Sequence, residues 1–328
     1  MILKKRSEPP EIFQLESLLQ RIPFNHSQFP HWTEKLRRIT AGFHGEQRVD
    51  SFWQEITLPI PHYLIHDLFI KKKHSTHQMD TILVTSRFIL VLEIKSISGL
   101  LHFDQQTRQF SRTNKDGSID GMRNPDDQVR RHEKWLEQFL TERKLDLPVI
   151  GAIVFAYPSA VIQSKAGNRI VIQSSGLPHL LDELLASYQQ DILSKALTKK
   201  LAVQLLKLHS IKQLPELILP PDYFRGVFCP KCQKGQLHYY WRKWACKSCS
   251  FSDPAAYLTA IEQYRVLCGP TITNRQFRDF IDLKDPAVTS KLLKDAKMPF
   301  EGSYKDRVYL IPGKNRGTES NSIDFESI

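Results

Sequence analysis

Phe88-Ile-Leu-Val-Leu-Glu-Ile-Lys95 is an apolar, strand-forming run that ends on a carboxylate and an ammonium group. Alternate side chains of a strand share a face, so Glu93 and Lys95 lie side by side. Upstream, Asp80 opens a second apolar stretch. If the two stretches pair as a hairpin, two carboxylates meet beside one ammonium group, a combination that is costly to bury without a purpose.

Two neighbouring carboxylates suit a hard divalent cation. Mg²⁺ takes one or two carboxylates, keeps several waters and also binds the phosphate oxygens of substrates. The sequence therefore predicts that Asp80 and Glu93 bind Mg²⁺ or Mn²⁺. Lys95 would then stabilise the phosphate or help to deprotonate the attacking water. The simpler alternative is a surface ion pair between Glu93 and Lys95, which is common at strand ends.

Helices predicted on both sides of these strands carry further polar residues. Apolar residues at three- and four-residue spacing predict a helix over Thr33–Trp53 with Glu46 on its inward face. Gly42 and Gly45 inside it predict close approach of another backbone or a ligand, because glycine costs roughly 1 kcal/mol relative to alanine within a helix.

A second helix is predicted to begin at Asn124-Pro125, since proline suits the first helical position. Gln128 shares a face of this helix with His132 and Trp135. An amide on a buried face needs a hydrogen-bond partner, which the acidic cluster would supply. The alternative is that Gln128 caps a neighbouring loop.

In this order, the segments resemble the NERD (nuclease-related) domain, a branch of the PD-(D/E)xK phosphodiesterase fold. The resemblance extends over about residues 40–155 and rests on Gly42-Phe-His-Gly-Glu46, Gln78-Met-Asp80, Glu93-Ile-Lys95 followed by Gly99, and Asn124-Pro-Asp-Asp-Gln128. Met79 stands where the name of the wider class has proline, a departure shared by many of its members.

The resemblance implies an α/β fold with a restriction-endonuclease-like mixed sheet, flanked by helices, in the order α-β-β-β-α-β. It also implies roles for five residues. Asp80 and Glu93 would be metal ligands, Lys95 the catalytic lysine, Glu46 a supporting acid and Gln128 an accessory residue. The family name leaves activity open, because the substrate is chosen by the site and not by the fold.

Composition indicates a folded protein of two or three domains: it has 328 residues, of which 41% are hydrophobic and 25% charged. No apolar run approaches the length of a membrane span, and the start of the chain turns polar too early for a signal peptide. We therefore expect a cytoplasmic protein without a membrane partner. There, five cysteines indicate metal binding or free thiols and not a disulfide framework.

Four cysteines form two Cys-x-x-Cys pairs, Cys229/Cys232 and Cys246/Cys249. The segment between the pairs is long enough for a β-hairpin that returns the second pair to the first, so a tetrahedral, structural zinc site of the zinc-ribbon type is predicted. Four unrelated thiols or two redox pairs are the alternative. Cys268 is expected to be a buried thiol in a helix.

Three helices and a terminal hairpin are predicted after the ribbon, an arrangement that resembles a winged helix. Asn274 and Asp285-Pro286 are expected to begin the second and third helices. From residue 225 to residue 316 there are 17 Lys and Arg against 8 Asp and Glu, a net of +9 out of +11 for the whole chain. This concentration favours a binder of the phosphate backbone. The residues expected to contact nucleic acid are Lys291, Lys294, Lys297, Lys305 and Arg307; the alternative is a solvated lysine face.

These segments suggest a domain order. Residues 1–213 would form the nuclease-like domain, with a helix near residues 12–21 on its core, and Pro215, Pro220 and Pro221 mark a linker at 214–225. The ribbon would occupy 226–252, the winged-helix-like module 253–312 and a disordered tail 313–328.

The function predicted from these features is metal-dependent hydrolysis of phosphodiester bonds in DNA. Two alternatives stay open: a catalytically inactive DNA-binding or scaffold protein, and an RNA-directed nuclease. The sequence identifies no protein partner.

Overall fold

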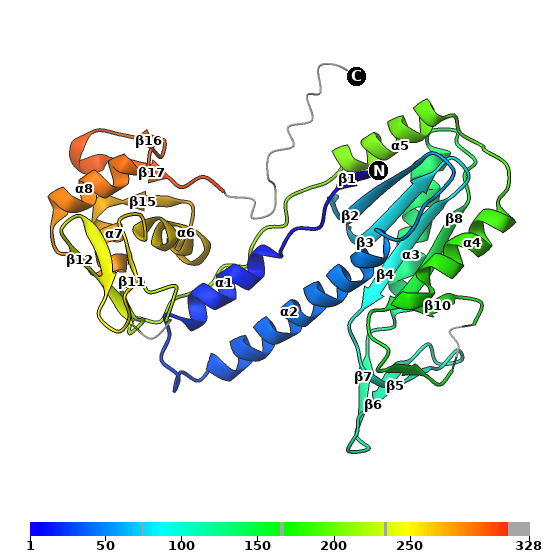
Figure 1. Ribbon diagram of the computed structural model, residues 1–328, viewed down its shortest axis with the longest axis horizontal. Helices are drawn as coiled ribbons and strands as arrows, with labels where there is room; N and C mark the ends of the chain where they lie inside the picture. The colour runs from blue at the N-terminus through cyan, green and yellow to red at the C-terminus, as the bar shows by residue number, and fades with distance from the viewer. Residues whose placement is uncertain (74, 165–166, 233–234, 314–328) are drawn as a thin grey trace. The chain divides into compact units, whose positions relative to one another are not determined.

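In the computed structural model the chain forms two compact units, and the described residues are 1–73, 75–164, 167–232 and 235–313 (Figure 1). Unit 1 comprises Met1–Ser7 and Thr40–Lys212, and unit 2 comprises Glu8–Ile39 and the chain from Gln213 onward. Within the described residues, none of the helices combines the length and the apolar character needed to cross a membrane.

A six-stranded mixed sheet forms the centre of unit 1. In spatial order its strands are β1 (Ile2–Lys4), β2 (His62–Lys71), β3 (Thr76–Thr85), β4 (Ile89–Lys95), β8 (Val149–Phe155) and β10 (Ile170–Gln173). Strands β2, β3 and β4 are antiparallel neighbours, whereas β8 runs parallel to both β4 and β10. The predicted pairing of the two apolar stretches is therefore confirmed.

Helices cover both faces of this sheet, which explains why β4 is apolar at successive positions. One face packs on α3 (Pro125–Thr141) and α5 (Lys195–Lys207), and Val91 lies in that core. The other packs on the end of α2 (Phe29–Phe52) and on α4 (Leu177–Ser187), which follows the single turn η1 (Ser174–Gly176); Leu90 lies there. Neighbouring residues of β4 thus serve opposite cores.

A second sheet was not predicted from the sequence; three of its four strands lie between β4 and α3 along the chain, and the fourth follows β8 (Figure 1). Its strands are, in spatial order, β7 (Ile119–Met122), β6 (Phe110–Thr113), β5 (Gly99–Phe103) and β9 (Ala160–Ile162). With β5, β6 and β7 set aside as an insertion, the elements α2, β2, β3, β4, α3 and β8 follow the expected order α-β-β-β-α-β. A mixed α/β fold is confirmed.

Unit 2 contains two small antiparallel sheets and four complete helices within its described part. The first sheet consists of β11 (Val227–Phe228), β12 (Gln236–Tyr240), β13 (Lys243–Cys246) and β14 (Ser252–Asp253). The helices are α1 (Pro10–Leu19), α6 (Tyr257–Cys268), α7 (Asn274–Ile281) and α8 (Pro286–Asp295). The second sheet has the order β15 (Thr271–Thr273), β17 (Val308–Leu310) and β16 (Phe300–Glu301), with the short turn η2 (Tyr304–Asp306) before β17.

One hydrophobic core joins all these parts of unit 2. Leu15 and Leu18 of α1 share it with Trp244 of β13, Ile261 of α6 and Phe277 of α7. The prediction that this first helix packs on the nuclease-like core is therefore wrong. Its amphipathic pattern showed that it needed a partner but not which core supplied it, because the partner lies more than two hundred residues away in the sequence.

Arg21 follows α1 and is fully buried in this unit. Its guanidinium group donates to the backbone oxygen of Gly226 at 3.2 Å and to Oε1 of Gln263 at 2.7 Å, and it lies 3.7 Å from the centre of the Phe280 ring. A buried charge is tolerated only with such partners. Arg21 thus ties the segment after α1 to α6 and α7.

The beginnings of two helices test the expected caps. Asp285 caps α8 as predicted, with its carboxylate accepting from the backbone amide of Ala287 at 2.7 Å. For α7 the cap is Thr273 and not Asn274, because Thr273 and Gln276 bond reciprocally in a capping box. Except for Gly313, the predicted tail 313–328 lies outside the described residues, and so does the Lys305 side chain.

Candidate active site and zinc site

Asp80 lies where the ladder between β3 and β4 ends. The last backbone pair of this ladder is Thr81 with Leu92. One residue further, Asp80 Oδ2 accepts a hydrogen bond of 2.7 Å from the backbone amide of Ile94. Continuing the register brings Asp80 level with Glu93, and residues directly opposite share a face of the sheet. The expected meeting of the two carboxylates is thus supported by the strand register.

Glu93, Lys95 and Gln128 are joined by hydrogen bonds. The Lys95 ammonium group lies 2.6 Å from Glu93 Oε1 and 2.7 Å from Gln128 Oε1. Glu93 is only 4% exposed, so the alternative of a surface ion pair is wrong. The loop-capping alternative for Gln128 is also wrong, because its amide oxygen accepts from the lysine of the cluster.

The second carboxylate oxygen of Glu93 is less well satisfied. Among the described residues, buried Glu93 Oε2 has no hydrogen-bond partner, and neither has His132 Nε2, which lies 3.8 Å away. Burial, followed by the charge of Arg131, lowers the pKa of His132 to about 3, which leaves the imidazole neutral at pH 7. An unpaired buried carboxylate oxygen is costly, and a bound cation would satisfy it.

Glu46 reaches the site through Arg6. The Arg6 guanidinium donates to Glu46 Oε2 at 2.6 Å, to Asp50 Oδ2 at 2.7 Å and to the backbone oxygen of Asp80 at 2.8 Å. It also donates to Thr81 Oγ1 at 3.1 Å. A single planar cation therefore holds the end of α2 against the strand that carries Asp80, which suits its rigid fork of donors.

Burial shifts all three carboxyl groups toward their protonated forms. Burial and the Asp80 charge raise the pKa of Glu93 to about 8. The same two causes raise the pKa of Glu46 to about 8, against the opposing charge of Arg6. Burial also raises the pKa of Asp80, although Lys95 and the Ile94 amide oppose it. Perturbed pKa values of this kind cluster at functional sites, and structural ion-pair networks also produce them.

The two glycines of α2 differ in their surroundings. A Cβ on Gly45 would lie 1.7 Å from Ser96 Oγ, so the helix is closely approached there, by a side chain and not by the backbone or ligand that was predicted. A Cβ on Gly42 would meet nothing within 4 Å, and the same expectation is wrong for this residue. Gly45 therefore allows the helix end that carries Glu46 to approach the residue after β4.

The donor set of unit 1 fits a hard divalent cation held by few protein ligands. Within the described residues, only the four cysteines of unit 2 form a group of three or more His, Cys, Asp or Glu with ligand atoms within 4.8 Å of one another. Unit 1 therefore offers the carboxylate pair Asp80 and Glu93, and not a cage of three acids. Mg²⁺ typically uses one or two carboxylates and keeps several waters.

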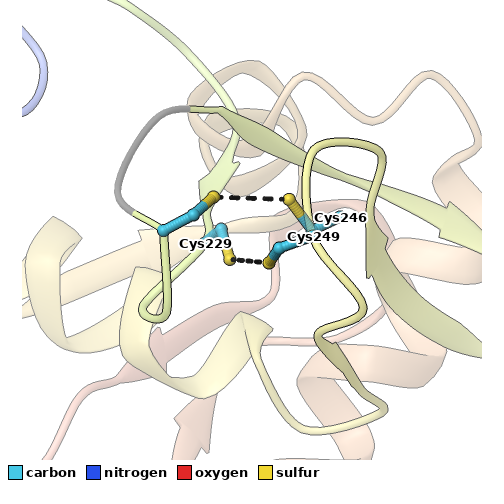
Figure 2. A group of neighbouring side chains, drawn as sticks. Cys229, Cys246 and Cys249 are labelled. Atoms are coloured by element: carbon cyan, nitrogen blue, oxygen red, sulfur yellow. Dashed lines mark hydrogen bonds between the residues drawn. The ribbon is translucent and has the colours of Figure 1, made fainter.

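The four cysteines of unit 2 converge between the β11–β12 and β13–β14 connections, and Figure 2 shows Cys229, Cys246 and Cys249 among them. The Sγ atoms of Cys229 and Cys249 lie 3.6 Å apart, as do those of Cys232 and Cys246. A tetrahedron with Zn–S bonds of about 2.3 Å has edges of about 3.8 Å, whereas a disulfide needs about 2.05 Å. The group therefore fits zinc, and the alternative of unrelated thiols is wrong.

Cys268 is the last residue of α6 and is exposed. It lies in a helix as predicted, but the prediction that its thiol is buried is wrong. The cause is its position: the apolar residue that turns inward at this end of the helix is Leu267.

The lysines expected to contact nucleic acid lie at the surface of unit 2. Lys291 and Lys294 are exposed on α8, one turn apart, and Lys297 is exposed just after the helix. Arg307 is half-buried, with its guanidinium 4.3 Å from the centre of the Phe300 ring. Their role stays a prediction.

Two site residues were missed at the level of sequence. Arg6 precedes Glu46 by forty residues, and a lone arginine after a three-residue strand gives no local signal. His66 contacts Asp50 Oδ1 at 3.2 Å and Thr81 Oγ1 at 3.1 Å. A histidine inside the apolar strand β2 was the available sign, because a buried polar side chain requires partners.

Comparison with known proteins agrees with this geometry. No curated protein and no solved structure matches the chain. A family model does match: residues 41–156 correspond to NERD, the nuclease-related domain. This segment contains Glu46, Asp80, Glu93, Lys95 and Gln128. The chain therefore carries a nuclease-related domain, and the cluster of Glu46, Asp80 and Glu93 lies within that domain.

Proposed function

We propose that unit 1 is a metal-dependent nuclease with a restriction-endonuclease-like core that hydrolyses phosphodiester bonds in DNA. The observation that carries the proposal is the meeting of Asp80, Glu93, Lys95 and Gln128 where the ladder between β3 and β4 ends and on the facing side of α3. It is supported by the match to a nuclease-related domain and by Glu93 Oε2, which has no hydrogen-bond partner in the described part of the chain.

In this proposal each side chain has a distinct task. Asp80 and Glu93 would hold Mg²⁺ or Mn²⁺, which supplies Lewis-acid stabilisation of negative charge on the phosphate. Lys95 donates hydrogen bonds to the reacting phosphate or takes part in deprotonating the attacking water. Gln128 accepts from the ammonium group and so orients it, and Glu46 supports the site from α2 through Arg6.

Unit 2 would hold the nucleic acid. We infer a structural Zn²⁺ in a ribbon and a winged-helix-like module, in which α6, α7 and α8 accompany the sheet β15-β17-β16. Lys291, Lys294, Lys297, Lys305 and Arg307 would contact phosphates. The net charge of +9 from residue 225 to residue 316 supports this assignment, because phosphate neutralisation provides essentially all of the non-specific affinity of nucleic-acid-binding proteins.

The decisive experiment is cleavage by the purified full chain. Labelled single- and double-stranded DNA and RNA are incubated with Mg²⁺, with Mn²⁺ and without added metal. We expect metal-dependent cleavage of DNA that Glu93→Gln abolishes, since the amide keeps the shape of the side chain and loses its charge. The matched control is Asp191→Asn. Asp191 pairs with Arg87 beside the β3–β4 turn, at the opposite end of the same strands.

The possible outcomes separate the alternatives. Cleavage by Glu93→Gln at the parental rate would refute the assigned site. Cleavage of RNA alone would establish an RNA-directed nuclease. No cleavage of any nucleic acid with either metal would indicate a nuclease-related domain that serves in DNA binding or as a scaffold.

A further inference from the structure

The turn between β12 and β13 has an unusual composition. Tyr240 pairs with Lys243, so Trp241 and Arg242 alone form the turn. Both residues have the left-handed backbone conformation, with φ of 47° for Trp241 and 61° for Arg242. Two-residue turns of this kind favour Asn-Gly, because both positions need positive φ. For other residues the left-handed conformation costs about 1–2 kcal/mol each.

The side chains at this turn are exposed. Trp241 is 79% exposed and Tyr240 66%, and their ring centres lie 5.9 Å apart. Packing explains other aromatic residues of the hairpin: Tyr239 lies against Trp244, which is buried in the core of unit 2. It does not explain Trp241, a large ring held in water at a strained position. Strain of this kind tends to occur at functional sites.

The surface around the rings is basic. Residues 226–252 contain five Lys or Arg and no Asp or Glu. Arg242 and Lys243 are exposed at the turn itself. Residues paired directly across two strands share a face, so Lys243 lies beside Tyr240, and His238 continues the outward row along β12. Asp253 of β14 pairs with Trp244, so an acid also lies near this end of the hairpin, on the side of β13 away from β12. At the turn itself, two exposed aromatic rings beside two cations complement a polyanion that carries flat, apolar groups.

We propose that this turn binds unpaired bases of a single-stranded nucleic acid, with Trp241 and Tyr240 stacking on bases and Arg242 and Lys243 contacting the flanking phosphates. This rests on the proposed function, to which it adds the class of substrate. Single strands are favoured over a continuous duplex because the base faces of a duplex are already covered by their neighbours. Exposed aromatic rings in a basic surface are the usual device for single strands.

In the test, fluorescence anisotropy measures the binding of the full chain to labelled oligonucleotides. No Mg²⁺ is added, and no chelator is present, so that zinc stays bound. Three probes are compared: oligothymidylate, an abasic strand of the same length and a blunt duplex. The variant is Trp241→Asn. Asparagine tolerates the left-handed conformation, so this substitution removes the ring and keeps the turn.

We expect Trp241→Asn to weaken oligothymidylate binding roughly 5- to 150-fold, in line with about 1–3 kcal/mol for each stacked base. Binding of the abasic strand should stay within about twofold, since phosphate contacts remain, and Trp241→Phe should restore most of the affinity. Phe24→Ala is the matched control, because it removes an aromatic side chain that is 84% exposed elsewhere in unit 2.

An unchanged affinity for oligothymidylate, or an equal loss on the abasic strand, would overturn the proposal. The turn would then be free for another partner, such as a protein. The two proposals fail separately. A chain that cuts DNA but does not distinguish the abasic strand keeps the nuclease and loses the stacking site. A chain that distinguishes the abasic strand but cuts no nucleic acid keeps the stacking site and loses the nuclease.

Discussion

Asp80 Oδ2 accepts a hydrogen bond of 2.7 Å from the backbone amide of Ile94, so a side chain continues the hydrogen bonding between β3 and β4 where their backbone ladder ends. One residue thus has two duties: it keeps a strand amide satisfied, and it presents a negative charge beside Glu93.

Substitutions of Asp80 should separate these duties. Asp80→Asn keeps an acceptor for the Ile94 amide and should abolish cleavage with little loss of stability. Asp80→Ala should abolish cleavage and also lower the free energy of unfolding by about 1–3 kcal/mol, the cost of an unsatisfied buried donor. Urea denaturation of both variants checks this. Equal stabilities would show that the hydrogen bond contributes nothing measurable.

Arg6 should be a main determinant of the stability of unit 1. Arg6→Met leaves Glu46 and Asp50 without their buried cation and should cost about 3–5 kcal/mol. Arg6→Lys should recover only part of this, because an ammonium group cannot form the forked contacts. The control is Lys5→Ala at the exposed neighbouring position, with an expected change within about 0.5 kcal/mol. A similar small change for Arg6→Met would contradict the assigned role.

His66 should make the stability of unit 1 sensitive to acid. Burial lowers the pKa of His66 to about 4, despite the opposing charge of Asp50, from about 6.5 in the unfolded chain. Between these values the unfolded chain binds a proton that the native chain does not, so stability rises with pH and is lost on acidification. The effect is at most about 3 kcal/mol.

The measurement for His66 is urea denaturation at pH 5 and pH 7. The parent should lose more stability on acidification than His66→Gln, whereas the exposed-site control His179→Gln should behave as the parent. The same pH dependence in His66→Gln would place the responsible group elsewhere.

Zinc should hold together all of unit 2, including α1. One equivalent of zinc should be present, and Cys229→Ser should lose it and unfold this unit, because the binding free energy of structural zinc, about 10–16 kcal/mol, exceeds the stability of most domains. Limited proteolysis should then cut within α1. Cys268→Ser, outside the tetrad, should retain both zinc and protection. A protected α1 in zinc-free Cys229→Ser would argue against the shared core.

The lysines of α8 should contribute equally to the binding of every DNA sequence. Lys291→Ala with Lys294→Ala should weaken binding by a similar factor on unrelated sequences, since phosphate contacts carry little base information. The slope of log affinity against log salt should fall by about 0.9 for each lost contact on duplex DNA. Lys291→Arg with Lys294→Arg keeps the charge and should keep the slope. An unchanged slope in the alanine variant would mark α8 as a solvated face.

The centre of the site could be predicted because its residues follow the two-residue repeat of a strand and the 3.6-residue repeat of a helix. Glu93 and Lys95 share a face through the strand repeat, and Gln128 follows from the helical repeat that also buries His132 and Trp135. Each element needed only its own local pattern. Apolar matching between two strands then sufficed to bring Asp80 to Glu93.

What escaped prediction depended on distant or weak signals. Arg6 contacts Glu46, forty residues away in the sequence, so no local pattern indicates the pair. The strands β5, β6 and β7 are short and partly polar, so they lack a clear alternation of apolar and polar residues. The cap of α7 was different: Thr273 followed by Gln276 is a readable capping box. It was missed because Asn274 is itself a good capping residue.

The division of the core of unit 2 between the two ends of the chain has a consequence during synthesis. Leu15 and Leu18 leave the ribosome early, yet their partners, Trp244 among them, are made more than two hundred residues later. At about 5–20 residues per second, the apolar side of α1 waits for roughly ten to forty seconds. Unit 1 can be completed in that interval, and a nascent chain that stalls near Lys212 presents α1 as a ready target for chaperones and proteases.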